Sequence, residues 1–376
     1  MTTAIEAASR TPVTLLTGFL GSGKTTVLNH VLKQPAMAAT AVIVNEFGEI
    51  GIDHLLVEKA TDDVVLMQSG CLCCTIRGDI ADTLVNLFVD RAKGRIPTFE
   101  RVVIETTGLA DPAPILHALM SDPIVAERYM VDGVVTTVDA VNGAATLDRQ
   151  VEAVKQAAVA DRLLLTKCDV AAAEDRVALE TRLRALNPGA ELMPVTGGAV
   201  EPEFLFNLGL FDPETKTVEV QRWLGDEAFA EDAQEHHDGD HDDRHDDHGD
   251  EDHHAGHHRH DVNRHDEHIS SFCIVREEPM SWTALSGWLD ALASMRGEDL
   301  LRVKAIVAID ERPGQPVVLH GVQHLFHPPV LLPAWPSDDH RTRIVFITRD
   351  MPREQIEKSL AAFVDADAPP NLAPLP

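Results

Sequence analysis

Three of the five cysteines in this 376-residue chain lie within four positions, at Cys71, Cys73 and Cys74. Thiolates at positions i, i+2 and i+3 can converge on one cation where the backbone turns, and Zn²⁺ prefers four tetrahedral ligands. Glu49, a nearby histidine or a ligand from another protein could fill the fourth position. Core packing and a redox relay are the alternatives for such cysteines. The spacing favours a three-thiolate metal site.

A glycine-rich loop upstream could bind phosphate. Residues 18–25, Gly-Phe-Leu-Gly-Ser-Gly-Lys-Thr, match the pattern G-x-x-x-x-G-K-[ST], between an apolar run at 12–17 and a helical run at 26–33. Glycines let backbone N–H groups curl around phosphate oxygens, and the helix N-terminus adds positive potential. Lys24 would reach the β- and γ-phosphates, and Thr25 would ligate Mg²⁺. A chance glycine turn is the alternative. The remaining candidate phosphate-binding residues are Gly18, Gly21, Ser22, Gly23 and Thr26.

Polar residues also close two apolar runs that read as strands. The run at 41–44 ends in Asn45, followed by Glu49, and the run at 101–104 ends in Glu105, followed by Gly108. Open α/β sheets bind ligands at the carboxyl ends of their strands. We expect Glu105 to bind Mg²⁺ directly or through water, and the Gly108 backbone to approach the γ-phosphate. Ordinary turns are the alternative at both places.

Residues 166–169, Thr-Lys-Cys-Asp, follow another apolar run and resemble the [NT]-K-x-D turn that recognises guanine. The Asp169 carboxylate can accept two hydrogen bonds from guanine, which adenine cannot supply, and the Lys167 stem can pack over the base. Thr166 opens this turn, and Cys168 is expected to be a packing residue. Residues 196–198 could complete the base pocket.

Residues 225–268 have a different composition from the rest of the chain. Positions 226–268 hold 17 Asp and Glu against 3 Arg, and positions 236–268 hold 12 of the 19 histidines. With almost no apolar residues this segment cannot form a core, so we expect it to be disordered alone and to collect metal ions. A solvated acidic linker or an expression tag is the alternative. The candidate ligands are His236, His237, His241, His245, His248, His253, His254, His257, His258 and His260.

Charge and hydropathy exclude several classes of protein. The formal net charge is −29, which argues against nucleic acid or an anionic membrane as a partner. Residues 1–10 contain Glu6 and no apolar run, so we expect them not to be a signal peptide, and no run of 18 apolar residues predicts a membrane span. Clustered cysteines without a disulfide framework indicate a reducing, cytoplasmic environment.

The elements that must position these residues form two folded parts. Apolar runs at 12–17, 41–44, 64–67, 101–104, 133–138, 161–165 and 190–195 read as strands, and 26–33, 79–93 and 147–160 as helices. Their alternation predicts an α/β fold, with a mostly parallel sheet covered by helices on both faces. We expect residues 1–10 to be flexible and 11–224 to form this nucleotide-binding domain.

A smaller α+β domain is predicted over 269–365, with a loose tail at 366–376. Its strands are expected at 269–276, 300–309, 316–320 and 344–348, with helices at 282–295 and 352–364. Leu285, Trp288, Leu289 and Leu292 share one face of the first helix, so helices should cover one face of this sheet.

Seven motifs in this order resemble the CobW-type metallochaperone GTPases. They are GFLGSGKTT (18–26), NEFGE (45–49), CLCC (71–74), ETTG (105–108) and TKCD (166–169), then LLRVKAI (300–306) and HGVQHLF (320–326). The resemblance implies a P-loop GTPase related to the nickel-delivery GTPases of urease and hydrogenase. It implies Mg²⁺-dependent GTP hydrolysis and transfer of Zn²⁺ or Co²⁺ to a client metalloprotein. By motif match, Lys24, Thr25 and Glu105 serve phosphate and Mg²⁺, Lys167 and Asp169 read guanine, and the three cysteines hold the metal.

Two positions depart from the family pattern. Val44 stands where some relatives have an acidic residue, which gives Glu49 more weight as fourth ligand, and Lys304-Ala305 stands where many have Lys-Gly. A cobalt- or iron-inserting GTPase for cobalamin biosynthesis or nitrile hydratase, a histidine-rich metal store, and a P-loop ATPase or kinase with redox cysteines remain alternatives. We expect a monomer or homodimer, nucleotide-dependent metal affinity, and slow hydrolysis without an arginine finger.

Overall fold

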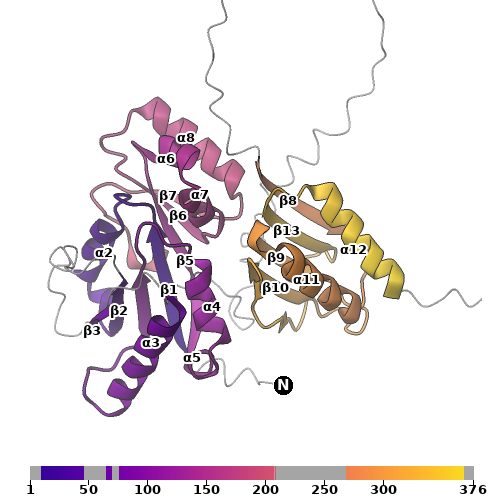
Figure 1. Cartoon of the computed structure of the whole chain (residues 1–376), viewed down its shortest axis with the longest axis horizontal. Coiled ribbons are helices and arrows are strands. Elements are labelled where there is room, and N and C mark those ends of the chain that lie inside the picture. Colours follow the sequence, from indigo (N-terminus) through magenta and orange to yellow (C-terminus); the bar gives the residue numbers. More distant parts are fainter. Residues whose placement is uncertain (1–9, 46–64, 70–75, 207, 209–267, 368–376) are drawn as a thin grey trace, which may run out of the picture.

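The computed structural model describes residues 10–45, 65–69, 76–206, 208 and 268–367. These residues form two β-sheets, each with its own helices (Figure 1). We call the parallel sheet with its helices the first domain and the antiparallel sheet with its helices the second domain. None of the helices in the described ranges is long and apolar enough to cross a membrane.

The first domain is built on a parallel sheet, in which the described residues supply seven strands. In sheet order these are β3 (Val65–Ser69), β2 (Thr40–Asn45), β4 (Arg101–Glu105), β1 (Thr11–Gly18), β5 (Tyr129–Asp139), β6 (Arg162–Thr166) and β7 (Glu191–Pro194). Every neighbouring pair runs parallel. Their carboxyl ends therefore meet at one edge, and β1 lies in the middle of the sheet.

Helices cover both faces of this sheet, as predicted. They are α2 (Lys24–Leu32), α3 (Ile76–Ala92), α4 (Ala113–Ser121), α5 (Pro123–Arg128), α6 (Gly143–Arg149), α7 (Val151–Ala158) and α8 (Ala173–Leu186). Alternate residues of β1 separate two cores: Val13 and Leu15 pack with α3 and α4, and Leu16 packs with α2. The α/β class with a doubly covered parallel sheet is confirmed.

The second domain is an antiparallel sheet with two helices. Its elements are β8 (Ile269–Arg276), α11 (Trp282–Arg296), β9 (Leu300–Val307), β10 (Val317–Val322), β11 (Leu325–Phe326), β12 (Val330–Leu331), β13 (Thr342–Arg349) and α12 (Arg353–Asp367). Leu285, Trp288, Leu289 and Leu292 are all buried in one core with Ile356 and Leu360 of α12. The predicted α+β domain with helices on one sheet face is confirmed.

The other face of β9 contacts the first domain. The Arg302 guanidinium donates to the Val159 carbonyl oxygen at 2.6 Å and to the Asp161 carboxylate, and the Lys304 ammonium lies 3.5 Å from the same carboxylate. Asp161 also accepts from the Val134 amide at 2.9 Å, which ties it to β5. All three charged side chains are less than a tenth exposed, so this ion cluster is sealed between the domains.

Several element predictions need correction. The helix expected over 147–160 is two helices, α6 and α7, because Gln150 adopts an extended conformation (φ −125°, ψ 105°) between them. The strand expected at 64–67 covers Val65–Ser69. Three helices, α4, α5 and α8, and the short strands β11 and β12 were not predicted.

Candidate functional site

The loop between β1 and α2 has a conformation that requires glycine. Gly18 (φ 141°), Gly21 (φ 72°) and Gly23 (φ 94°) all have positive φ, where other residues are strained. A Cβ on Gly18 would lie 2.3 Å from the Thr137 hydroxyl and 2.7 Å from the Ser22 hydroxyl. The glycine at position 18 therefore lets the loop lie against Thr137 of β5.

Lys24 lies inside this loop. Its side chain is buried, and its ammonium group donates to the carbonyl oxygens of Gly18 at 2.9 Å and Phe19 at 3.2 Å. Carbonyl oxygens are weaker partners for an ammonium group than phosphate oxygens are. A bound phosphate would therefore compete well for Lys24, as the sequence predicts.

Thr25 and Glu105 meet in front of the loop. The Thr25 hydroxyl donates to Glu105 Oε1 at 2.7 Å, across 80 residues of sequence. Strand register explains the meeting, because β1 and β4 run parallel with Leu16 opposite Glu105. Beside them, the Thr107 hydroxyl is buried and has no hydrogen-bond partner among the described residues. This set of oxygen atoms, one of them ionisable and one unsatisfied, fits Mg²⁺ or its bound water.

Gly108 brings a second backbone segment against the phosphate loop. A Cβ there would lie 2.5 Å from the Leu20 backbone nitrogen and 2.7 Å from its Cα. The preceding Thr106 is fixed to β1 by an N–H bond of 3.0 Å to the Leu16 carbonyl oxygen. Only glycine allows this approach, so the segment ending at Gly108 and the loop form one surface.

The Thr-Lys-Cys-Asp turn follows β6 at the same edge of the sheet. Lys167 has a left-handed backbone (φ 58°), and its ammonium group lies 2.6 Å from Asp139 Oδ2 at the end of β5. The Thr166 hydroxyl donates to the Ser22 carbonyl oxygen at 2.6 Å, which joins the turn to the phosphate loop. Asp169 is exposed, so its carboxylate is accessible to a ligand.

Asp139 was not predicted as a site residue. Burial works against its charged form, but hydrogen bonds from Lys167 and Asn142 hold the pKa of its carboxyl below the usual value. Oδ1 also accepts from the Val141 and Asn142 amides at the start of α6. Its place as the last residue of a buried strand is a signal that sequence reasoning could have used.

A cavity of about 230 Å³ lies between the phosphate loop, the end of β5 and the helices α6 and α7. Its polar walls include Ser22, Asp139, Asn142, Gln156 and Lys167. Cys168 packs against the core formed by α7 and α8, and its thiol donates to the Leu165 carbonyl oxygen at 3.0 Å. The expectation that Cys168 is a packing residue is confirmed.

The turn at 196–198 reaches the start of α2. Gly197 and Gly198 have φ of 60° and 80°, and a Cβ on Gly198 would lie 2.7 Å from the Thr26 carbonyl oxygen. The structure therefore gathers the phosphate loop, Glu105, the Gly108 segment, Lys167 and the 196–198 turn at one edge of the sheet.

The predicted ligands of the transferred metal, unlike the predicted Mg²⁺ ligands Thr25 and Glu105, lie outside the described residues. These are Cys71, Cys73, Cys74, Glu49 and the ten histidines between His236 and His260, and the description of Asn45 stops at its backbone. The described chain enters the link at 70–75 from β3 and leaves it into α3. Within the described ranges, no three His, Cys, Asp or Glu side chains form a group that could hold a metal ion.

Comparison with known proteins gives matches over both domains. Residues 12–194 match the family described as "CobW/HypB/UreG, nucleotide-binding domain", and residues 269–364 match "Cobalamin synthesis protein cobW C-terminal domain". The chain is 32% identical to "Zinc chaperone YjiA" of Escherichia coli (strain K12), over 93% of this chain and 98% of that protein. It is 37% identical to "Zinc chaperone CobW" of Sinorhizobium sp, over 37% of this chain and 39% of that protein.

A solved structure agrees with this sequence relationship. The crystal structure of Zn(II)-bound YjiA GTPase from E. coli superposes with a TM-score of 0.68 and 29% identity, covering 94% of this chain and 99% of that chain. The resemblance inferred from the seven motifs is confirmed. The chain belongs to the CobW family, with a CobW/HypB/UreG nucleotide-binding domain followed by a CobW C-terminal domain.

Proposed function

We propose that this protein is a GTP-hydrolysing metallochaperone, which binds Zn²⁺ at Cys71, Cys73 and Cys74 and transfers it to a client protein under the control of nucleotide state. Family membership and relatives named as zinc chaperones and GTPases support the general class. The observation that best supports the nucleotide site is the hydrogen bond of 2.7 Å from the Thr25 hydroxyl, next to Lys24 in the chain, to Glu105 Oε1. We also propose a cytoplasmic location, because a reducing compartment keeps clustered thiols available for metal.

The residues around the phosphate loop would have different roles in phosphoryl transfer. Backbone N–H groups of residues 18–25 would hold the phosphates, and Lys24 would leave its two carbonyl partners for the β- and γ-phosphates. Thr25 and Glu105 would hold Mg²⁺, which neutralises charge on the phosphate oxygens. Gly108 would offer its N–H to the γ-phosphate, so that this segment distinguishes GTP from GDP. Hydrolysis is expected to be slow without a partner.

The turn at 166–169, after β6, would select guanine over adenine. The exposed carboxylate of Asp169 can accept from guanine N1–H and N2–H₂, while Lys167, fixed by Asp139, presents its stem to the base. The test is turnover of GTP and ATP by the full chain with Mg²⁺, with and without one equivalent of Zn²⁺ or Co²⁺. GTP should be used in strong preference. Equal use of both nucleotides would contradict the assignment.

An Asp169→Asn variant sharpens this test. Loss of a charged acceptor for two base donors should weaken GTP binding by at least about tenfold. Asp175→Asn is a matched control, because Asp175 is also exposed, lies in the first turn of α8, and has no proposed role. The assignment of Asp169 fails if both variants bind GTP as tightly as the unaltered chain.

The proposed Zn²⁺ site at Cys71, Cys73 and Cys74 is tested separately. Cys71→Ser, Cys73→Ser and Cys74→Ser should each weaken one tight Zn²⁺ site, and Cys168→Ser should not, since Cys168 packs in the first domain. Glu49→Gln tests the preferred fourth ligand. Deletion of residues 236–268 should lower total metal capacity and leave the tight site. Disappearance of the tight Zn²⁺ site with that deletion would contradict the assignment of this site to the three cysteines.

A further inference from the structure

A short segment after Glu105 links the nucleotide site to the second domain. It runs from Gly108 to Asp111, immediately before α4. At its start, Gly108 is in backbone contact with Leu20 of the phosphate loop. At its end, the Asp111 carboxylate is held by side chains from both domains. The segment therefore contacts the phosphate loop at one end and side chains of both domains at the other.

The beginning of the segment is fixed from α7. Gln156 is fully buried, and its Nε2 donates to the carbonyl oxygens of Gly108 at 3.2 Å and Ala110 at 2.9 Å. The Gln156 backbone carbonyl oxygen accepts from the Thr136 hydroxyl at 2.7 Å, which anchors α7 to β5. A buried side chain of α7 thus helps to hold the Gly108 and Ala110 peptides.

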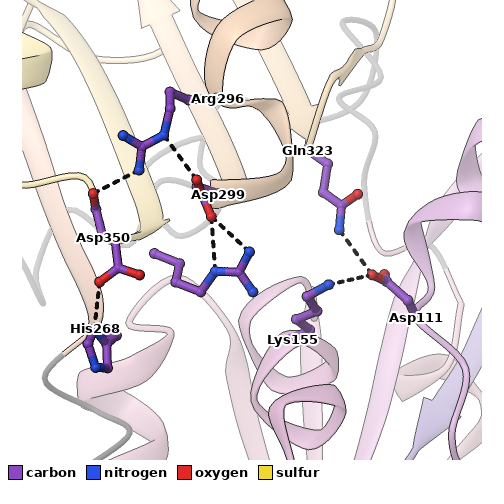
Figure 2. A network of polar contacts seen from close by, with 8 residues as sticks. Asp111, Lys155, His268, Arg296, Asp299, Gln323 and Asp350 are labelled. Carbon is purple, nitrogen blue, oxygen red and sulfur yellow. Dashed lines mark hydrogen bonds and ion pairs between the residues drawn. The ribbon is translucent and has the colours of Figure 1, made fainter.

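The end of the segment is fixed at Asp111 (Figure 2). Asp111 Oδ1 accepts from the Ala113 amide at 3.0 Å at the start of α4, and Oδ2 lies 2.9 Å from the Lys155 ammonium. Gln323 Nε2, from the second domain, donates to the same Oδ2 at 3.2 Å. The carboxylate therefore joins a helix start, a neighbouring helix and the second domain.

Gln323 occupies a position that favours glycine. It is the first of the two residues joining β10 to β11, where Val322 pairs with Leu325, and its φ is 54°. A two-residue hairpin turn with positive φ at its first position is usually built with glycine. The glutamine strains the backbone, yet its side chain is only 6% exposed and reaches Asp111.

The hairpin is seated firmly on the first domain. Val322 is buried in the core cluster that contains Ile115, Leu116 and Leu119 of α4. The His324 ring lies 5.4 Å from the His117 ring of α4. The turn therefore has a fixed position from which Gln323 can orient the Asp111 carboxylate.

We infer that Gln323 of the second domain is a positioning residue for the nucleotide site, which holds the segment 108–111 through Asp111 in the arrangement that receives the γ-phosphate. The inference rests on the proposed GTP site. GDP has no group at the γ-position, so the contact acts on the affinity for GTP and leaves the affinity for GDP unchanged. By linkage, GTP binding also strengthens the contact between the hairpin and Asp111.

The experiment measures the affinities of the full-length chain for GMPPNP and for GDP, by calorimetry with Mg²⁺. In Gln323→Gly the side chain is lost while the turn gains a residue suited to φ 54°, so the melting temperature should not fall. The variant should bind GMPPNP about tenfold more weakly, the effect of losing one hydrogen bond to a charged group, and GDP within about twofold of the unaltered chain. A merely structural role would change stability and leave the ratio of the two affinities unchanged.

His324→Ala is the matched control, since it changes the other residue of the same turn and leaves Gln323 and Asp111 intact. It should preserve the affinity ratio. An unchanged ratio in Gln323→Gly overturns the inference and leaves the proposed function intact. Failure of the unaltered chain to bind either guanine nucleotide overturns the proposed function, and the inference with it.

A double variant tests the route through Asp111. Asp111→Ala removes the acceptor of Gln323 and Lys155, so Gln323→Gly added to it should have no further effect on the ratio. Additive effects of the two changes would show that Gln323 acts by another route, and would overturn the inference.

Discussion

Strand β6 has charged residues at both ends, and the two ends lie in different surroundings, one buried and one exposed. Asp161, just before its first residue, is buried and bound by Arg302 and Lys304 of the second domain. Lys167 and Asp169, just after its last residue, lie at the edge with the phosphate loop, and Asp169 is exposed. In a parallel sheet the carboxyl ends of the strands are the place for ligands. Here the amino end has become one of the places where the two domains are joined.

The joined end depends on one carboxylate. Burial lowers the pKa of Arg302 and that of Lys304, the latter to about 8, although Asp161 favours the charged form of both. Burial also lowers the pKa of two histidines stacked beside them, His320 to well below the usual value and His327 to about 4. Asp161 is therefore the counter-charge that lets two cations remain buried.

The largest effect is expected from Asp161→Asn. It leaves Arg302 and Lys304 buried without a counter-charge, which should reduce the free energy of unfolding by about 3–5 kcal/mol. Urea unfolding of the full chain measures this loss. A loss below about 1 kcal/mol would show that the sealed cluster does not hold the domains together.

Acid should weaken the same interface. A histidine whose folded pKa is lowered binds its proton in the unfolded state first, so stability is lost as pH falls from about 6.5 towards the folded pKa of about 4 for His327. Between pH 6.5 and 5 this amounts to about 2 kcal/mol for one such histidine.

His327→Phe keeps a ring to stack on His320, whose ring lies 4.5 Å away, and cannot titrate. Urea unfolding at pH 6.5 and pH 5 should show a smaller acid loss in this variant. His340→Phe, at an exposed histidine stacked on Trp335, is the control and should keep the full loss. Equal losses in His327→Phe and the unaltered chain would contradict this account.

At the ligand end of β6 and its neighbours, substitutions should affect binding and leave folding nearly unchanged. Thr25→Ala removes the hydroxyl that bonds to Glu105 and should weaken Mg²⁺-dependent GTP binding by about tenfold. The free energy of unfolding without nucleotide should change by less than about 1 kcal/mol. A large loss of stability with unchanged GTP affinity would show that this end of the sheet serves folding and not binding, which contradicts the comparison between the two ends.

The smallest effect is expected at the surface. Asp350 pairs with His268 at 2.5 Å, but both side chains are more than half exposed. Asp350→Asn should therefore change the free energy of unfolding by less than about 1 kcal/mol. The same denaturation experiment measures it, and it is the control for Asp161→Asn. Comparable losses in the two variants would mean that burial does not set the strength of these pairs.

The two ends of β6 were not equally predictable. The grouping of the candidate site residues at the carboxyl end could be predicted because their motifs constrain the backbone: Gly18, Gly21 and Gly23 have the positive φ that phosphate loops need, and parallel strands gather their carboxyl ends. The buried pairing of Arg302 and Lys304 with Asp161 was not predicted, because arginine and lysine side chains in a strand usually face solvent. Their partner Asp161 is 141 residues from Arg302, and sequence periodicity carries no information on such contacts.

Helix predictions failed for a related reason. The break at Gln150 has neither glycine nor proline to mark it, so α6 and α7 were merged into one helix. Helix α8 has Leu179, Leu183 and Leu186 on one buried face at helical spacing, a signal that was present and not used. The sequence therefore carries no local signal for the break at Gln150, whereas the spacing of the leucines in α8 could have been used to predict that helix.

We propose that nucleotide state and Zn²⁺ affinity are coupled through the link at 70–75, which joins β3 to α3, and one measurement tests this coupling directly. Zn²⁺ affinity is measured for the full chain saturated with GMPPNP and with GDP, in the presence of a chelator of known affinity. The two dissociation constants should differ by at least about fivefold, and Zn²⁺ should change the ratio of GMPPNP to GDP affinity by the same factor. Equal Zn²⁺ affinities in the two nucleotide states would contradict the proposed coupling.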